Sequence, residues 1–165
     1  HRVESDATFS QQNGRLSIAL TATGTPDDPM SATWLLGTAP RDVALVADFR
    51  LEPNSPGGLR LLLGSNAEGA DGVALTVDAL RQRWAFEGWV RGQPMWNPTW
   101  YDLTEPLTDG AHRAILFAQG GQLGAGVDRR LPQGLRRVAM EPGRFGAAAL
   151  TWGAPTVSPR DWRPA

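Results

Sequence analysis

The chain has 165 residues, of which 16 are basic and 17 acidic, for a formal net charge of −1. Positive charge is not clustered, which argues against a nucleic-acid or anionic-membrane surface, and no apolar run approaches the roughly 20 residues that span a bilayer. Cysteine is absent, which excludes disulfides, thiolate metal sites and cysteine nucleophiles.

The hydrophobic content of 41% fits a single globular domain over residues 1–165, whose core needs no metal or disulfide. All 16 basic residues are arginine, and together with the abundant Ala, Gly and Pro this is typical of a GC-rich bacterial genome. The N-terminus lacks a signal-peptide pattern and starts abruptly. We therefore expect a mature or excised domain of a larger bacterial protein.

The sequence predicts strands rather than helices, because apolar residues recur with a period of two. In Val43–Glu52 they alternate with Asp48 and Arg50, and Gly58–Ser65 repeats the pattern with inward-facing leucines. The predicted strands are Arg15–Leu20, Ser31–Leu36, Val43–Glu52, Gly58–Ser65, Gly72–Leu80, Arg83–Val90, His112–Gln119, Gln122–Leu131 and Arg144–Trp152.

Turn signals separate these strands. Gly120-Gly121 alone joins His112–Gln119 to Gln122–Leu131, which predicts a two-residue hairpin with positive φ at both loop positions. No segment has a convincing amphipathic helical stripe. Many short strands with frequent turns predict an antiparallel sandwich or barrel, followed by a Pro-rich final edge segment in Ala154–Ala165.

Three stretches carry a family resemblance: Phe9–Leu20, Asp42–Ser65, and the closing run from His112 through Trp162. In order they have an Asn-Gly turn into a strand, two long strands across a Gly-rich bend, and a tight hairpin ending in Val-Asp. This resembles the concanavalin A-like lectin/glucanase superfamily, which includes laminin-G-type domains. The resemblance implies an all-β, antiparallel two-sheet jelly-roll sandwich with one concave sheet, often used to bind or hydrolyse glycans. One departure is Asp128, which Arg129 follows where many members have Gly.

Catalytic signatures are missing. Hydrolytic members resemble this chain but carry Glu-x-Asp-x-Glu on one strand, where alternation places the carboxylates on one face. Here Asp48 and Glu52 flank Arg50 as a solvated strand face, and His112 is expected to cap or flank a strand. The sequence therefore offers no recognisable catalytic triad or metal cluster, which favours a non-catalytic protein over an enzyme.

Calcium is left open as a cofactor. Asn66, Glu68 and Asp71 in one loop, and Asp27 and Asp28 in another, offer the oxygen ligands that Ca²⁺ prefers. Ordinary turn chemistry explains both loops without an ion.

Four of the seven Trp and the single Tyr fall within Arg83–Asp102. Alternation places Trp84, Phe86 and Val90 on one face, suited to the core. It places Arg83, Glu87, Trp89 and Arg91 on the other face. An aromatic among charged hydrogen-bonding side chains can stack on a sugar ring and bind its hydroxyls.

Beyond this strand, Trp96, Trp100 and Tyr101 are predicted to lie in an irregular loop bounded by Pro. They could cover the open end of the sandwich, stack on a glycan or anchor a protein partner.

We predict a non-catalytic binding domain, outside a bacterial cell or on its surface, with a carbohydrate or cell-surface protein as partner. The alternatives are an assembly module docking a neighbouring domain or identical subunit, and a divergent glycoside hydrolase. The predicted carbohydrate-binding residues are Glu87, Trp89, Arg91, Trp96, Trp100 and Tyr101.

Overall fold

The computed structural model describes residues 7–20, 24–51, 56–66, 71–107, 110–128, 133–137 and 143–153. Within these ranges the chain forms strands and no helix, so none of the described elements is a helix that could span a membrane. The strands are β1 (Ala7–Gln12), β2 (Arg15–Leu20), β3 (Met30–Thr38), β4 (Val43–Phe49), β5 (Gly57–Ser65), β6 (Gly72–Asp78), β7 (Arg83–Val90), β8 (Gln93–Pro94), β9 (Thr99–Asp102), β10 (His112–Gln119), β11 (Gln122–Val127), β12 (Gln133–Arg137) and β13 (Arg144–Thr151).

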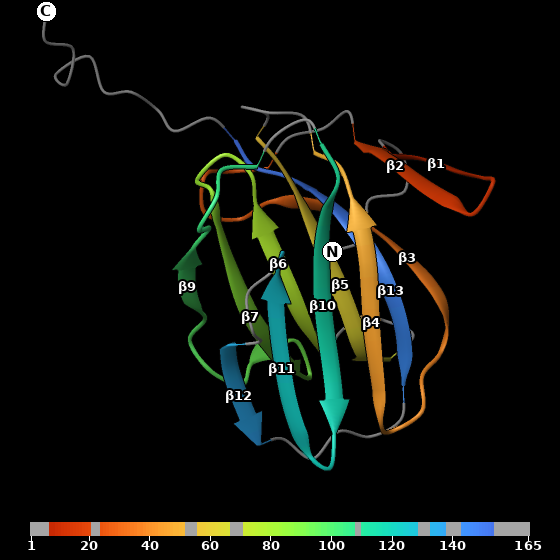
Figure 1. Ribbon diagram of the computed structural model, residues 1–165, viewed down its shortest axis with the longest axis vertical. Helices are drawn as coiled ribbons and strands as arrows, with labels where there is room; N and C mark the ends of the chain where they lie inside the picture. Colours follow the sequence, from red (N-terminus) through yellow and green to blue (C-terminus); the bar gives the residue numbers. More distant parts are fainter. Residues whose placement is uncertain are drawn as a thin grey trace, which may run out of the picture.

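Two antiparallel sheets face each other (Figure 1). The front sheet has four strands in the order β12–β11–β10–β4. The back sheet has seven: β3–β13–β5–β6–β7–β8 in order, with β9 pairing along the other end of β7. The prediction of an all-β antiparallel two-sheet sandwich is confirmed.

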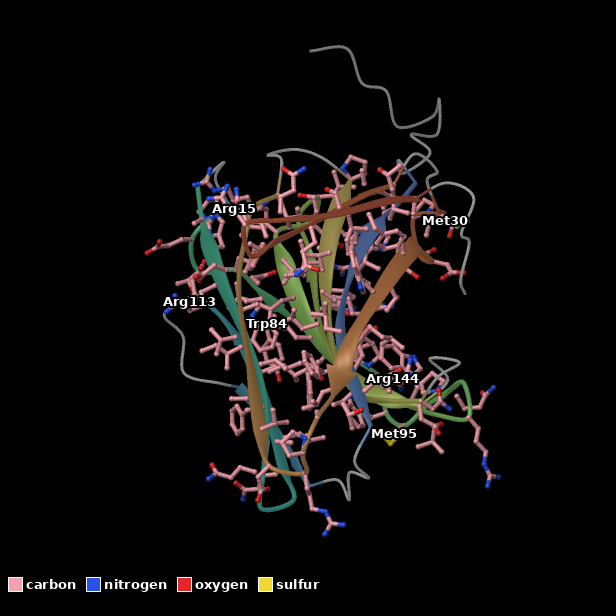
Figure 2. All side chains as sticks on the ribbon, turned by 90° about the vertical axis from the view of Figure 1, so that its right-hand side faces the viewer. Arg15, Met30, Trp84, Met95, Arg113 and Arg144 are labelled. Atoms are coloured by element: carbon pink, nitrogen blue, oxygen red, sulfur yellow. The ribbon has the colours of Figure 1, made fainter. Side chains whose placement is uncertain are left out.

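The core lies between the sheets, because alternate residues of each strand point to the same side. Leu63, Leu75 and Trp84 of the back sheet belong to one cluster with Leu116 and Leu123 of the front sheet, and each is at most 1% exposed. Figure 2 shows Trp84 in the space between the sheets. Burying one such side chain contributes roughly 1.5–3 kcal/mol, so this cluster stabilises the packing of the two sheets against each other. The outer face of the back sheet points away from this core.

Three hairpins turn on two residues with positive φ, the geometry of type I′ turns. Gly120 and Gly121 have φ of 56° and 75°, which confirms the predicted hairpin between β10 and β11. Asn13-Gly14 joins β1 to β2 with the same conformation, and Arg91-Gly92 joins β7 to β8. The last of these turns projects from the edge of the seven-stranded sheet.

Several details differ from the sequence-based expectations. Arg15–Leu20 is not a strand of either main sheet: as β2 it pairs only with β1, in a hairpin that lies against β3 and β13. The predicted strand Val43–Glu52 ends at Phe49, and Gln122–Leu131 ends at Val127. The strands β1, β8, β9 and β12 were not predicted. Ala154–Ala165 lies outside the described residues.

Candidate functional site

Strand β7 divides its side chains between the core and the outer face of the seven-stranded sheet. Trp84 and Phe86 face the core and are 1% and 3% exposed, as the alternation predicts. Glu87 and Trp89 point to the opposite side and are half-buried. The prediction for Val90 was wrong: it is 49% exposed, because it borders the Arg91-Gly92 turn, beyond the reach of the core.

Three adjacent strands contribute to one polar cluster on this outer face. Arg60 of β5 donates from Nε to Oγ1 of Thr76 on β6 at 3.0 Å and from Nη2 to Oε2 of Glu87 on β7 at 3.2 Å. Thr76 in turn donates to the same Oε2 at 2.5 Å. The Arg60 and Glu87 side chains are 20% and 17% exposed. The cluster is therefore prearranged, with part of each charged group still accessible.

Trp89 completes this cluster. The guanidinium carbon of Arg60 lies 5.1 Å from the centroid of the Trp89 ring, a cation–π arrangement. The ring also packs against Leu62, Ala74 and Ala148, a small apolar cluster on the outer side of the sheet. Trp89 is thus fixed between apolar neighbours and an arginine while remaining partly exposed.

Trp100 lies on the same face. In the register between β9 and β7 it stands opposite Ala85, next to the row that contains Thr76. The guanidinium carbon of Arg83 lies 4.0 Å from the centroid of the Trp100 ring. Residues Thr99–Asp102 therefore form a strand, and the prediction of a loop was wrong for them: β9 satisfies backbone groups on the edge of β7 that β8 leaves unpaired.

A buried carboxylate supports this second aromatic. Asp78, whose side chain is 0% exposed, accepts hydrogen bonds at Oδ2 from Arg81 at 3.0 Å and from Arg83 at 3.2 Å. Arg81 also donates to the carbonyl oxygen of Pro26 at 2.7 Å. Asp78 therefore holds the guanidinium group that covers Trp100.

Trp96 and Tyr101 lie on the other side of the sheet. The indole Nε1 of Trp96 donates to the carbonyl oxygen of Phe86 at 2.9 Å, and the two rings lie 5.3 Å apart. Tyr101 stacks on Trp84 with a centroid distance of 4.7 Å. Both residues pack against the main core. The aromatic residues of Arg83–Asp102 thus separate into an outer pair, Trp89 and Trp100, and an inner group of four, Trp84, Phe86, Trp96 and Tyr101.

Arg91 stands at the tip of the β7–β8 hairpin. Its φ of 52° is left-handed, and its backbone N–H donates to Oδ1 of Asp71 at 2.5 Å. Asp71 also accepts a hydrogen bond from the side-chain amide of Asn66 at 3.2 Å. These bonds tie the β5–β6 connection to the hairpin, near the end of β7 that carries Trp89.

The two predicted calcium loops have turn contacts of their own. Asn66 and Asp71 are joined to each other, whereas Glu68 lies outside the described residues. In the other loop the backbone N–H of Asp28 donates to Oγ1 of Thr25 at 2.9 Å, and Asp27 is exposed. Among the described residues no three His, Asp or Glu side chains converge as a metal site would require.

A cleft of about 820 Å³ lies at one end of the four-stranded sheet, lined by its strand ends and by the segment that follows β9. In it, Nδ1 of His112 lies 3.1 Å from Oδ2 of Asp128, whose left-handed φ of 57° builds the turn without Gly. Arg113, which points outward from β10 in Figure 2, forms two hydrogen bonds with Asp48 and lowers the pKa of that carboxyl group. His112 thus flanks its strand, as predicted, and carries an aspartate partner.

Sequence reasoning missed Arg60 and Thr76. The signal for Arg60 was present, because it stands between the inward-facing Leu59 and Leu61 and must point outward by alternation. Its partners could not be read in the same way, because the order β5–β6–β7 is set by strand pairing.

The two facing sheets and their strand order define a concanavalin A-like jelly roll, and solved structures confirm this fold. The chain is similar to the carbohydrate-binding module CBM66 from Bacillus subtilis, at 16% identity and a TM-score of 0.67, with 88% of each chain covered. It is also similar to a glycoside hydrolase family 16 endo-glucanase from Bacteroides ovatus (8% identity, TM-score 0.57, 90% of this chain and 72% of that one). A third match is the CBM2 module of the evolved Dit protein of Lactobacillus casei BL23 phage J-1 (21% identity, TM-score 0.54, 87% and 71% covered).

Because these identities are all low, the likeness establishes the fold alone. No protein-family model matches the sequence, and the comparison with curated proteins finds no significant relative.

Proposed function

We propose that this protein is a non-catalytic carbohydrate-binding domain that works outside a bacterial cell or on its surface. The observation that carries the proposal is the cluster of Arg60, Glu87 and Trp89 on the outer face of the seven-stranded sheet. Trp100 on β9 extends the same face.

A sugar presents apolar C–H groups on its ring faces and hydroxyl groups at its rim, so its binding site needs aromatic area beside fixed donors and acceptors. Trp89 offers a partly exposed ring, and the neighbouring Arg60 and Glu87 offer N–H donors and carboxylate acceptors. Hydrogen bonds to charged groups contribute about 1.5–3 kcal/mol each. The cluster is preformed in the free protein, which lowers the entropy cost of binding.

The arrangement changes which residues we assign to the site. Glu87, Trp89 and Trp100 remain, joined by Arg60 and Thr76, and Arg91 lies at the rim. Trp96 and Tyr101 are assigned to the core, because their polar or aromatic contacts are made with Phe86 and Trp84.

The low-identity matches support the proposal in one respect. The module from Bacillus subtilis is described as carbohydrate-binding and covers 88% of this chain. A fold by itself hosts several functions, so the residues on the outer face carry more weight than the match does.

The test is a glycan array probed with the wild type and with the single variants Trp89→Ala and Trp100→Ala. We expect binding by the wild type and a loss of about tenfold or more in the Trp89 variant. Phe9→Ala is the matched control, because Phe9 is a 41% exposed aromatic on the β1–β2 hairpin. The proposal fails if the wild type binds no glycan, or if Trp89→Ala binds as the wild type does.

The assembly alternative depended on an exposed aromatic loop, and two of its three aromatic residues pack inward. Light scattering after size exclusion tests the assembly alternative, since stable self-association would favour it.

The hydrolase alternative needs a second carboxyl group about 5 Å from Glu87 for retaining cleavage. Activity on a polysaccharide panel that disappears in Glu87→Gln would favour the hydrolase alternative.

A further inference from the structure

Three arginines that serve the outer face of the seven-stranded sheet beside Trp89 and Trp100 are paired with carboxylates. Arg60 is paired with Glu87 at 3.2 Å, and Arg81 and Arg83 are both paired with Asp78. Asp102 stands opposite Arg83 in the β9–β7 register and adds a third carboxylate to the face. These three guanidinium groups are thus matched by three carboxylates, and Arg91 stands outside this group at the tip of the β7–β8 hairpin.

The pairing in the centre of the face is tight. Oε2 of Glu87 accepts hydrogen bonds from both Arg60 and Thr76, and the two charged side chains are about four-fifths buried. An anionic group brought to Arg60 would also approach the Glu87 carboxylate. Attraction to one and repulsion from the other largely cancel, whereas the anion still loses its hydration.

Hydroxyl groups meet no such conflict. A guanidinium group has five N–H donors, and within the described residues the hydrogen bonds of Arg60 use Nε and Nη2. The donors on Nη1 and the second oxygen of Glu87, Oε1, take no part in these bonds. A hydroxyl group can accept from the first and donate to the second at the same time.

We infer that the ligands of this face are uncharged glycans, and this inference rests on the proposed function. Glu87 determines the preference by neutralising Arg60. Uronic-acid and sulfated glycans are rejected. Glu87 has this role because it is the carboxylate bonded to the arginine that also contacts Trp89.

The experiment compares matched neutral and acidic polysaccharides by affinity electrophoresis and calorimetry. The probes are mixed-linkage β-glucan before and after oxidation of its C6 hydroxyl groups to carboxylates, and polygalacturonate with its carboxylates methyl-esterified or free. For the wild type we expect the acidic member of a pair to bind about tenfold or more weakly than the neutral one. In Glu87→Gln, which frees the charge of Arg60, this ratio should fall towards one or invert.

Asp48→Asn is the control for a change of net charge alone, because Asp48 forms an exposed ion pair on the other sheet. It should leave the neutral-to-acidic ratio of the wild type unchanged. Thermal unfolding of the Glu87 variant accompanies the assay, so that the ratio is compared between folded proteins.

The outcomes separate this inference from the proposed function. Tighter binding of the acidic glycans by the wild type, lost in Trp89→Ala, would keep the carbohydrate-binding function and overturn the neutral preference. A ratio that is the same in Glu87→Gln as in the wild type would overturn the role of Glu87. Binding to neither class would overturn both proposals.

Discussion

The guanidinium carbon of Arg60 lies 5.1 Å from the centroid of the Trp89 ring, although β6 separates the strands that carry the two residues. Arg60 reaches across β6, bonds to Thr76 and Glu87 on the way, and ends beside the indole. One side chain therefore couples three strands, and the aromatic and polar parts of the proposed site are held by the same arginine.

This coupling can be measured as an interaction energy. A double-mutant cycle of Arg60→Ala and Trp89→Ala, followed by denaturant unfolding, should give about 0.5–1 kcal/mol of interaction between the residues. Additive effects of the two substitutions would contradict the contact. Replacing Trp89 in a protein that already carries Phe9→Ala serves as the additive control, since Phe9 contacts Trp34 on a different part of the fold.

Gly88 has no room for a side chain, because a Cβ atom there would overlap the Trp96 ring and the end of Met95. We expect Gly88→Ala to cost about 1–3 kcal/mol of unfolding free energy, because it displaces Trp96 from the edge of the core. The indole N–H resonance of Trp96, which reports its hydrogen bond to Phe86, should move in the NMR spectrum. Val90→Ala on the same strand is the control, and an unchanged indole resonance in Gly88→Ala would contradict this prediction.

The buried carboxylate of Asp78 should matter more for stability than the exposed one of Asp48. Asp78→Asn leaves Arg81 and Arg83 without their anion and should lower the free energy of unfolding by about 2–3 kcal/mol. The loss should be smaller than for a fully buried ion pair, because the arginine side chains are 27% and 30% exposed. Asp48→Asn, measured in the same urea series, should have a much smaller effect because its ion pair is solvated. Equal effects would show that Asp78 is not the anchor of these arginines.

Arg91 occupies a left-handed position that Asn adopts more readily than Arg does. Arg91→Asn should therefore stabilise the fold by about 0.5–1 kcal/mol, since the hydrogen bond to Asp71 comes from the backbone and is retained. Arg91→Lys, which has no such preference, should leave the stability unchanged. If the guanidinium group takes part in binding at the rim, glycan affinity will fall in both variants, independently of the gain in stability.

The Asp48–Arg113 pair predicts a pH dependence. Hydrogen bonds from Arg113 hold the pKa of Asp48 below its ordinary value of 3.8. Because the folded pKa is the lower one, the stabilising contribution is complete above pH 3.8 and is lost as the pH falls through the folded value. The difference in Tm between the wild type and Asp48→Asn should shrink as the pH is lowered from 3.8 through the folded pKa of Asp48. A difference that persists unchanged at the acidic end would contradict the assignment.

The alternation along β5, β6 and β7 could be read directly from the sequence, and it placed Trp84 and Phe86 in the core and Glu87 and Trp89 outside. The same rule failed for Val90, because alternation gives a direction and the extent of the opposing sheet decides burial. It also failed for Thr99–Asp102. Those residues are a short segment close to Pro98, and they form a strand only because β7 offers an unpaired edge beside them.

By itself the sequence determined the all-β class, the two-residue hairpin at Gly120-Gly121 and the side on which each β7 residue points, because these depend on neighbouring residues and local backbone preference. Only the tertiary structure decided that Arg60 and Thr76 join Glu87, and that Trp100 faces outward while Trp96 and Tyr101 pack inward. Those facts depend on strand order and on how a connecting segment folds back. Contacts between residues far apart in the chain fix both, and no local pattern encodes them.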